Sequence, residues 1–330
     1  MSVSNKIATS PPVIGLDRVM WISLATTERG IAPRQAFRPA AVTCAIQGAR
    51  AFLTLVKPEI TLMVMISAGI SFLMASDSLN LVVLTHTVLG TGLVAAGAAT
   101  LNQFMERVLD GNMRRTSKRP LPAGELSARA ALVFGISLSI AGTIYLIQFL
   151  NTLTALLGLL TLLSYLFVYT PLKRKTRLCT LVGAFPGAAP ILMGWAAVKN
   201  NLGLESWALY AILFLWQFPH FYAIGWLYRE DYARGGMLML PAVDDDDGRT
   251  TFRAILISTQ LLIVVSVVPT LMATTGRLYF LLAIILGLSF YYVAYRASVS
   301  RSKSGAKQLL HASVIYLPLL YLAMLIDKIK

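Results

Sequence analysis

Three oxygen-bearing side chains recur at four-residue intervals where a long apolar segment ends. They are Asn102, Glu106 and Asp110, and an apolar run over about 82–104 leads into them. Residues four apart stack along one face of an α-helix, so the three side chains form a polar ladder. Mg²⁺ prefers carboxylate oxygens, usually together with substrate phosphates. The spacing therefore predicts a magnesium site at the mouth of a helix bundle.

A cluster of basic residues follows the ladder at once. Its members are Arg114, Arg115, Lys118 and Arg119. Guanidinium groups and lysine ammonium groups suit phosphate oxygens. Basic residues alone are more typical of a loop that sets membrane topology. Acids at helical spacing followed directly by bases favour a phosphate-binding site, because ionisable residues at a membrane boundary are costly to keep.

A second basic region lies after another apolar segment. Tyr169 precedes Lys173 and Arg174, and the run 183–190 that follows is rich in glycine, alanine and proline. The basic pair again fits either a phosphate site or a topology signal. Glycine and proline inside a span permit either close helix packing or a break in the helix. A break beside a cavity would leave room for a bulky ligand.

A third region combines an intramembrane histidine with an acid beyond the end of its segment. His220 follows Pro219 among aromatic residues, and Asp231 lies eleven positions later. We expect Asp231 to complete the metal site from the side opposite the ladder. His220 is a candidate for the site of an acceptor molecule, although a hydrogen-bonded structural histidine is an equally good interpretation. The acidic run 244–247 is explained by a solvated loop and by charge at a helix N-terminus.

Composition shows where these residues must lie. Apolar residues make up 56% of the 330 positions and charged residues only 13%, whereas soluble domains have about a quarter charged. A helix needs about 20 apolar residues to cross a bilayer. The sequence predicts an all-α, polytopic membrane bundle of about nine helices. We expect spans near 56–75, 82–104, 128–149, 152–169, 179–198, 207–227, 252–273, 278–295 and 308–326.

The net charge of +14 does not indicate nucleic-acid binding, because the basic residues occur in short tracts between apolar segments. Of the 29 Lys and Arg residues, eighteen fall in the loops after the second, fourth, sixth and eighth predicted spans or at the span ends that border them, and seven in the N-terminal segment through Lys57. Only four fall on the other side. Since positive residues stay in the cytoplasm, the N-terminus is predicted inside and the C-terminus outside.

The first part of the chain differs from the rest. We interpret 1–54 as a cytoplasmic tail, disordered or interfacial, and 55–330 as the transmembrane domain. A secretory signal is not indicated, because no apolar core precedes a small-residue cleavage site. An organellar presequence remains an alternative, and a bacterial inner membrane is favoured over a mitochondrial one. The two cysteines, Cys44 and Cys179, do not form a disulfide framework or have metal-ligand spacing.

Over about 55–326 the sequence resembles the UbiA superfamily of intramembrane prenyltransferases, and within it the branch that prenylates haem. The motifs that carry the resemblance are 57–61, 113–121, 169–174, 183–190, 216–221, 231–232 and 239–241. Two departures stand out. The family's first motif has Asp where this chain has Glu106, and the wider superfamily's second motif has acids four residues from Asp231, where this chain has Leu227 and Gly235.

The resemblance implies a UbiA-like bundle around a central cavity, with farnesyl diphosphate as donor and haem B as acceptor. Asn102, Glu106, Asp110 and Asp231 would bind Mg²⁺ and act in catalysis. The basic clusters, Tyr169 and His220 would bind the substrates within the lipid bilayer, and haem A synthase is a candidate downstream partner. Two alternatives stay open: a UbiA-type enzyme with an aromatic or quinone-precursor acceptor, and a transporter that uses the carboxylates as an ion site.

Overall fold

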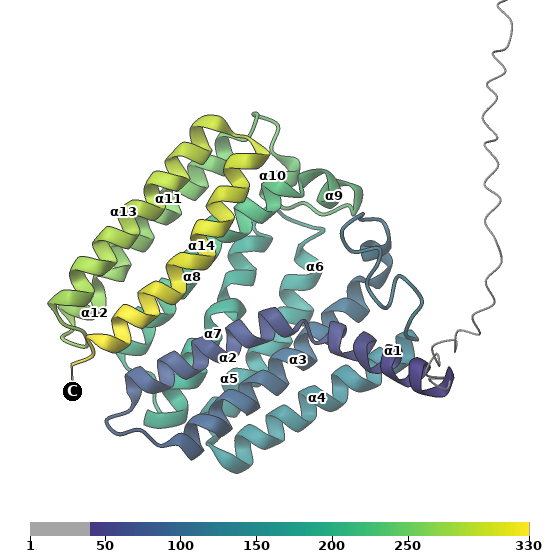
Figure 1. Ribbon diagram of the computed structural model, residues 1–330, viewed down its shortest axis with the longest axis horizontal. Coiled ribbons are helices and arrows are strands. Elements are labelled where there is room, and N and C mark those ends of the chain that lie inside the picture. The colour runs from purple at the N-terminus through teal and green to yellow at the C-terminus, as the bar shows by residue number, and fades with distance from the viewer. Residues whose placement is uncertain (1–39, 330) are drawn as a thin grey trace, which may run out of the picture.

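The computed structural model describes residues 40–329, except for the side chains of 40–47. Over this range the protein is all-α (Figure 1). The long helices are α1 (Ala40–Leu55), α2 (Pro58–Ala75), α3 (Leu81–Gly111), α4 (Ala128–Phe149), α5 (Thr152–Leu163), α7 (Cys179–Lys199), α8 (Leu204–Leu227), α11 (Arg249–Ser266), α13 (Arg277–Ser300) and α14 (Lys303–Ile326). The short ones are α6 (Thr170–Leu172), α9 (Arg229–Arg234), α10 (Leu240–Val243) and α12 (Val268–Leu271), and a π-helical turn, η1, covers Ser164–Tyr169.

Nine helical segments within the described range are long and apolar enough to cross a membrane, as predicted. Their boundaries agree with the predicted spans to within a few residues, with one main exception. The second span continues to Gly111 rather than ending near 104, so the whole ladder lies within α3. Many large apolar side chains on the outer faces are exposed, as expected where lipid replaces water.

Several helices begin at a side chain that caps the first turn. The Asn80 side chain accepts from the backbone N–H groups of Val82 and Val83, and Ser127 caps α4 through the N–H of Ala130. Asn151 and Ser302 cap α5 and α14 in the same way. Because Ser, Asn and Asp satisfy the unpaired N–H groups of a helix start, these residues separate successive spans. The connections before α5 and α14 are as short as two residues, whereas the loop before α4 is long.

Small residues allow the helices to approach closely. A Cβ on Gly194 of α7 would collide with the backbone oxygen of Ala68 on α2, and the nearby Ser71 hydroxyl donates to the carbonyl of Ile191 at 2.6 Å. Pro186 and Pro190 lie inside α7, which nevertheless runs unbroken from Cys179 to Lys199. Of the two predicted roles for this segment, close packing is therefore correct and a break in the helix is wrong.

The long loops and the short helices α6, α9 and α10 gather at one end of the bundle, whereas α12 lies near the C-terminus. The loop after α3 lies there beside α9, while the C-terminus lies at the other end (Figure 1). A buried cluster joins the loops to each other: Met113, Cys179, Tyr232, Met237 and Met239 pack together. This cluster holds the basic segment after α3 against the segment that contains Asp231.

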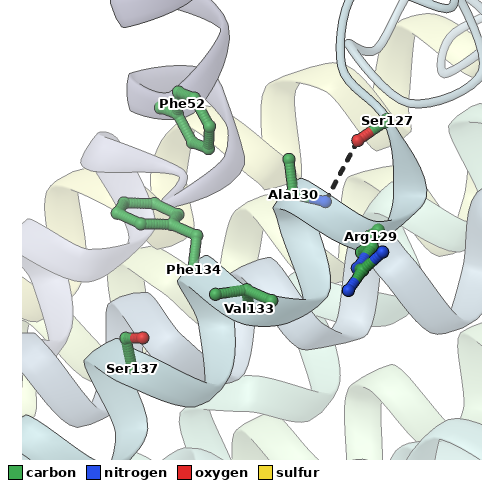
Figure 2. Close-up of a pocket in the computed structure, with 7 residues that line it drawn as sticks. All are labelled: Phe52, Ser127, Arg129, Ala130, Val133, Phe134 and Ser137. Carbon is green, nitrogen blue, oxygen red and sulfur yellow. Dashed lines mark hydrogen bonds between the residues drawn. The ribbon is translucent and has the colours of Figure 1, made fainter.

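Helix α1 is attached to the same end by few contacts. The amide of Gln103 donates to the carbonyls of Thr54 and Leu55, and the rings of Phe52 and Phe134 meet edge to face at 4.9 Å. A surface pocket of about 550 Å³ lies between α1 and α4 and includes Arg129 (Figure 2). None of the predicted site residues lines this pocket.

The close contact between α2 and α7 predicts that a larger side chain at position 194 destabilises the protein. Gly194→Ala should lower the free energy of unfolding by about 1–3 kcal/mol, because the new methyl group overpacks a backbone-to-backbone contact. Gly48→Ala in α1 is the matched control, since nothing lies within 4 Å of its Cβ position. Thermal unfolding of the purified protein in detergent measures both. Equal melting temperatures for the two variants would contradict the close approach.

Candidate active site

The polar ladder forms as predicted along one face of α3, and it is buried. Asn102, Glu106 and Asp110 are exposed by only 1%, 5% and 1%. Each of the three accepts a hydrogen bond from a basic side chain. Lys57 Nζ lies 3.2 Å from Asn102 Oδ1, Lys173 Nζ 2.7 Å from Glu106 Oε1, and Arg119 Nη1 2.6 Å from Asp110 Oδ2. The ladder is therefore one side of a buried charge network.

The cations of this network come from three separate parts of the chain. Lys57 lies between α1 and α2 in a left-handed conformation with φ 47°, directly before Pro58. Arg119 comes from the loop after α3, and Lys173 follows α6. Arg119 and Lys173 were predicted from the sequence as site residues, whereas Lys57 was not. A lysine directly before a helix-starting proline at a membrane boundary is the signal that was available.

The network has more positive than negative charge. Three basic side chains face two carboxylates and an amide, so one positive charge is in excess when Lys57 is protonated. Burial, together with Arg119 and Lys173, lowers the pKa of Lys57 to about 7. Burial alone would lower the pKa of Lys173, but Tyr169 and Glu106 outweigh it and the pKa is raised. A bound anion would offset this positive charge and favour the protonated form of Lys57. The site is therefore suited to a multiply charged anion such as a diphosphate.

A π-helical turn orients Asn102, the first residue of the ladder. The Thr170 hydroxyl donates to the Tyr165 carbonyl at 2.8 Å, so its oxygen accepts from Asn102 Nδ2 at 3.2 Å. With its NH₂ group engaged there, Asn102 turns its Oδ1 toward Lys57. One-turn π-helices occur often at functional sites. Thr170 is a second residue that sequence reasoning missed, because a π-turn leaves no periodic signal.

Tyr169 is positioned by the same turn. Its ring lies under Lys173, with the ammonium 4.8 Å from the ring centroid. Gly183 of α7 makes room for the ring, since a Cβ there would lie 2.5 Å from a ring carbon of Tyr169. The glycine in the small-residue run thus supports Tyr169 and, through it, Lys173.

Asp231 lies near the basic loop but takes other partners. Its Oδ1 accepts from the backbone N–H of Arg114 at 3.3 Å, and it forms an ion pair with Arg234. The guanidinium of Arg115 donates to the Tyr232 hydroxyl at 2.7 Å and stacks over that ring at 4.3 Å. The structure therefore joins the predicted Asp231 and Arg115 regions to each other. That Asp231 is a metal ligand stays a prediction.

The remaining predicted residues take no part in the hydrogen bonds and ion pairs that define the charge network. The side chains of Arg114, Lys118 and Arg174 are exposed. His220 lies inside α8, where Nδ1 is 2.8 Å from the Ser313 hydroxyl of α14. In the acidic run, Asp244 and Asp246 accept from the backbone N–H groups of Thr251 and Thr250 at the start of α11. The helix N-terminus interpretation of this run is confirmed.

The donor set of the ladder is compatible with Mg²⁺. Among residues 48–329, no group of three His, Cys, Asp or Glu side chains converges on one point. A dedicated protein cage for a metal is thus not built from these residue types. Mg²⁺ characteristically binds one or two carboxylates together with substrate phosphates. Glu106, Asp110 and the amide oxygen of Asn102, all buried hard donors, fit that pattern.

Comparison with known proteins assigns the family. Residues 62–317 match the UbiA prenyltransferase family. The chain belongs to this family. The UbiA-family chain is 50% identical to the protoheme IX farnesyltransferase of Solibacter usitatus, covering 84% of this chain and 99% of that protein. It is 44% identical to the protein of the same name from Koribacter versatilis, over 84% and 93% of the two chains.

Solved structures agree with this fold. A structure described as digeranylgeranylglyceryl phosphate synthase superposes with a TM-score of 0.71 at 18% identity, covering 85% of this chain and 98% of that one. A UbiA homologue of Archaeoglobus fulgidus bound to DMAPP and Mg²⁺ superposes with a TM-score of 0.62 at 14% identity, covering 83% and 98%. At such identities the likeness establishes the shared UbiA fold, and the predicted all-α membrane bundle is confirmed.

The pairing of Lys173 with Glu106 predicts a non-additive effect on stability. Lys173→Met should destabilise this UbiA-family protein by about 3–5 kcal/mol, because it leaves a buried carboxylate without its cation. The double variant Lys173→Met with Glu106→Gln should recover most of the loss. Unfolding of both variants in detergent gives the comparison. If the single and the double variant lose the same free energy of unfolding, Lys173 and Glu106 are not coupled.

The orientation of Asn102 by Thr170 predicts a weaker cation site when the hydroxyl is removed. Thr170→Val should weaken Mn²⁺ binding about tenfold in the presence of inorganic diphosphate, because the amide loses its fixed orientation. Thr170→Ser keeps the hydroxyl and should bind as the wild type does. Electron paramagnetic resonance of free and bound Mn²⁺ measures the affinity. Similar affinities for Val and Ser variants would argue against this role of Thr170.

Proposed function

We propose that this protein transfers the farnesyl group of farnesyl diphosphate to a vinyl group of haem B, making haem O. The observation that carries the reaction class is the buried ladder with its excess of cations, which suits a diphosphate. The acceptor is inferred from the relatives named protoheme IX farnesyltransferase, which match over nearly their whole length. Haem A synthase would then be a candidate partner that receives the product.

Each side chain of the network has a defined role in this reaction. Arg119, Lys173 and Lys57 would move from the ladder onto the diphosphate oxygens, and Arg115 would assist from the neighbouring loop. As the allylic carbon–oxygen bond breaks, the electron pair leaves with the diphosphate, whose growing charge these cations stabilise. The ladder would hold Mg²⁺ through Asn102, Glu106 and Asp110, with Asp231 as a further proposed ligand. When bound, the metal supplies additional neutralisation of that charge.

The apolar helices would protect the allylic cation from water until the acceptor reacts. The haem vinyl group is an electron-rich alkene, and its terminal carbon forms the new bond to farnesyl. The positive charge then lies on the vinyl carbon next to the porphyrin. Water adds there and loses a proton, which leaves a hydroxyethylfarnesyl substituent. No covalent bond to the protein is needed.

The location of the charges favours this function over a transporter. A transporter that uses carboxylates as an ion site is expected to hold them near the middle of the bilayer. Here the acids lie in the last turns of α3, next to a basic loop. We further propose that this end faces the cytoplasm of a bacterial cell, because most Lys and Arg residues belong to its loops.

The first test is haem O formation. Membranes with wild-type protein, haem B, farnesyl diphosphate and Mg²⁺ should give haem O by mass spectrometry, and a chelator should prevent it. Asp110→Asn should lower the rate at least about a hundredfold, because Arg119 loses its carboxylate partner and the ladder loses a ligand. Asp245→Asn, in the exposed acidic loop, is the matched control and should retain wild-type activity.

Other outcomes point to the two alternatives. Unchanged haem B with folded wild-type protein, but prenylation of an aromatic acid or quinone precursor, would reassign the acceptor. If no prenyl diphosphate is hydrolysed or transferred to any acceptor, the enzyme proposal fails and the transporter becomes the better interpretation.

A further inference from the structure

Ser313 of α14 contacts two aromatic side chains of α8 at once. Its backbone carbonyl accepts from the indole Nε1 of Trp216 at 2.8 Å, and its hydroxyl lies 2.8 Å from His220 Nδ1. The rings of Trp216 and His220 stack, with centroids 4.6 Å apart and planes 22° from parallel. Ser313 therefore fixes one edge of the imidazole directly. It also fixes the indole ring of Trp216, which stacks on the face of the imidazole.

These hydrogen bonds determine the tautomer of His220. The Ser313 hydroxyl has a single proton, and it donates that proton to the carbonyl of Leu310 at 2.6 Å. The hydroxyl oxygen must then accept from His220, so Nδ1 carries the hydrogen. In a membrane span the neutral imidazole is the less costly form. Its other nitrogen, Nε2, consequently presents a lone pair.

Burial indicates which edge of the ring is available. Ser313 is completely buried at 0% exposure, whereas His220 is only partly buried. The Nδ1 edge is thus covered by α14. A histidine held through one nitrogen, with the other deprotonated, is the arrangement that metal-ligating histidines have in proteins.

We propose that His220 Nε2 is an axial ligand of the iron of haem B, and that Ser313 is the positioning residue that prepares it. The inference rests on the proposed function, because it takes haem B as the acceptor. His220 lies seven residues before the end of α8, which is about 10 Å along the axis from the end that carries the charge network. We expect an iron held at this depth to direct the porphyrin edge that carries the vinyl groups toward that end.

The role of Ser313 is tested by haem titration of the purified protein in lipid nanodiscs. Ser313→Ala should bind ferric haem B about tenfold more weakly and change its absorption and paramagnetic resonance spectra, because the imidazole loses the partner that sets its tautomer. Ser313→Thr keeps the hydroxyl and should restore the wild-type spectrum. Identical spectra and affinities for wild type and the Ala variant would overturn the role of Ser313.

The ligand itself is tested by chemical rescue. His220→Gly should lose the spectrum of histidine-ligated haem, and added imidazole should restore it, which a structural role of the ring would not produce. His311→Ala, an exposed histidine on α14, is the matched control and should keep the wild-type spectrum. A wild-type spectrum in His220→Gly without imidazole would overturn the proposal.

The same proteins separate this inference from the proposed function. If wild-type protein makes haem O while His220→Gly binds haem with an unchanged spectrum, the axial ligand is refuted and the farnesyl transfer stands. If the haem spectrum depends on His220 but wild-type membranes make no haem O, the ligand is supported and the transfer is refuted.

Discussion

Two carboxylates and an amide buried at the end of a membrane helix are the constraint on which the rest of this structure depends. Glu106 and Asp110 are almost inaccessible, and an isolated charge in such a place is very costly. Each is therefore matched by a cation in direct contact. Because those cations come from distant parts of the chain, the loops after α3 and α6 and the junction before α2 must meet at one point.

The surrounding features follow from that requirement. The buried cluster of Met113, Cys179 and Tyr232 with its neighbours holds two loops together where they deliver charged groups. The carbonyl of Lys173 accepts from the N–H of Leu238 at 2.7 Å, which ties the segment after α9 to the same place. The excess of cations makes the network incomplete by itself. A bound anion would offset the excess positive charge and favour the protonated form of Lys57, which suits a site that binds a diphosphate.

The proposed reaction divides between a polar end and an apolar interior. The charged network at the end of α3 handles the leaving group, whereas His220 lies deeper, among aromatic rings and against α14. Such a division keeps water and charge away from the allylic cation until the alkene attacks. In the proposed site the intramembrane His220 has a role beyond packing, because one nitrogen is covered and the other is available to a ligand.

The sequence by itself determined the membrane bundle, the nine spans within residues 40–329, the family and the spacing of the ladder. Apolar length and four-residue periodicity are local properties, so Asn102, Glu106 and Asp110 could be identified without coordinates. The partners of these residues were decided by tertiary structure. Lys57 lies 45 positions from Asn102, and Ser313 lies 93 positions from His220. The π-turn that brings Thr170 to Asn102 also leaves no periodic pattern. Contacts between distant segments depend on how helices pack, and helix packing follows from the shape of whole faces rather than from any one motif.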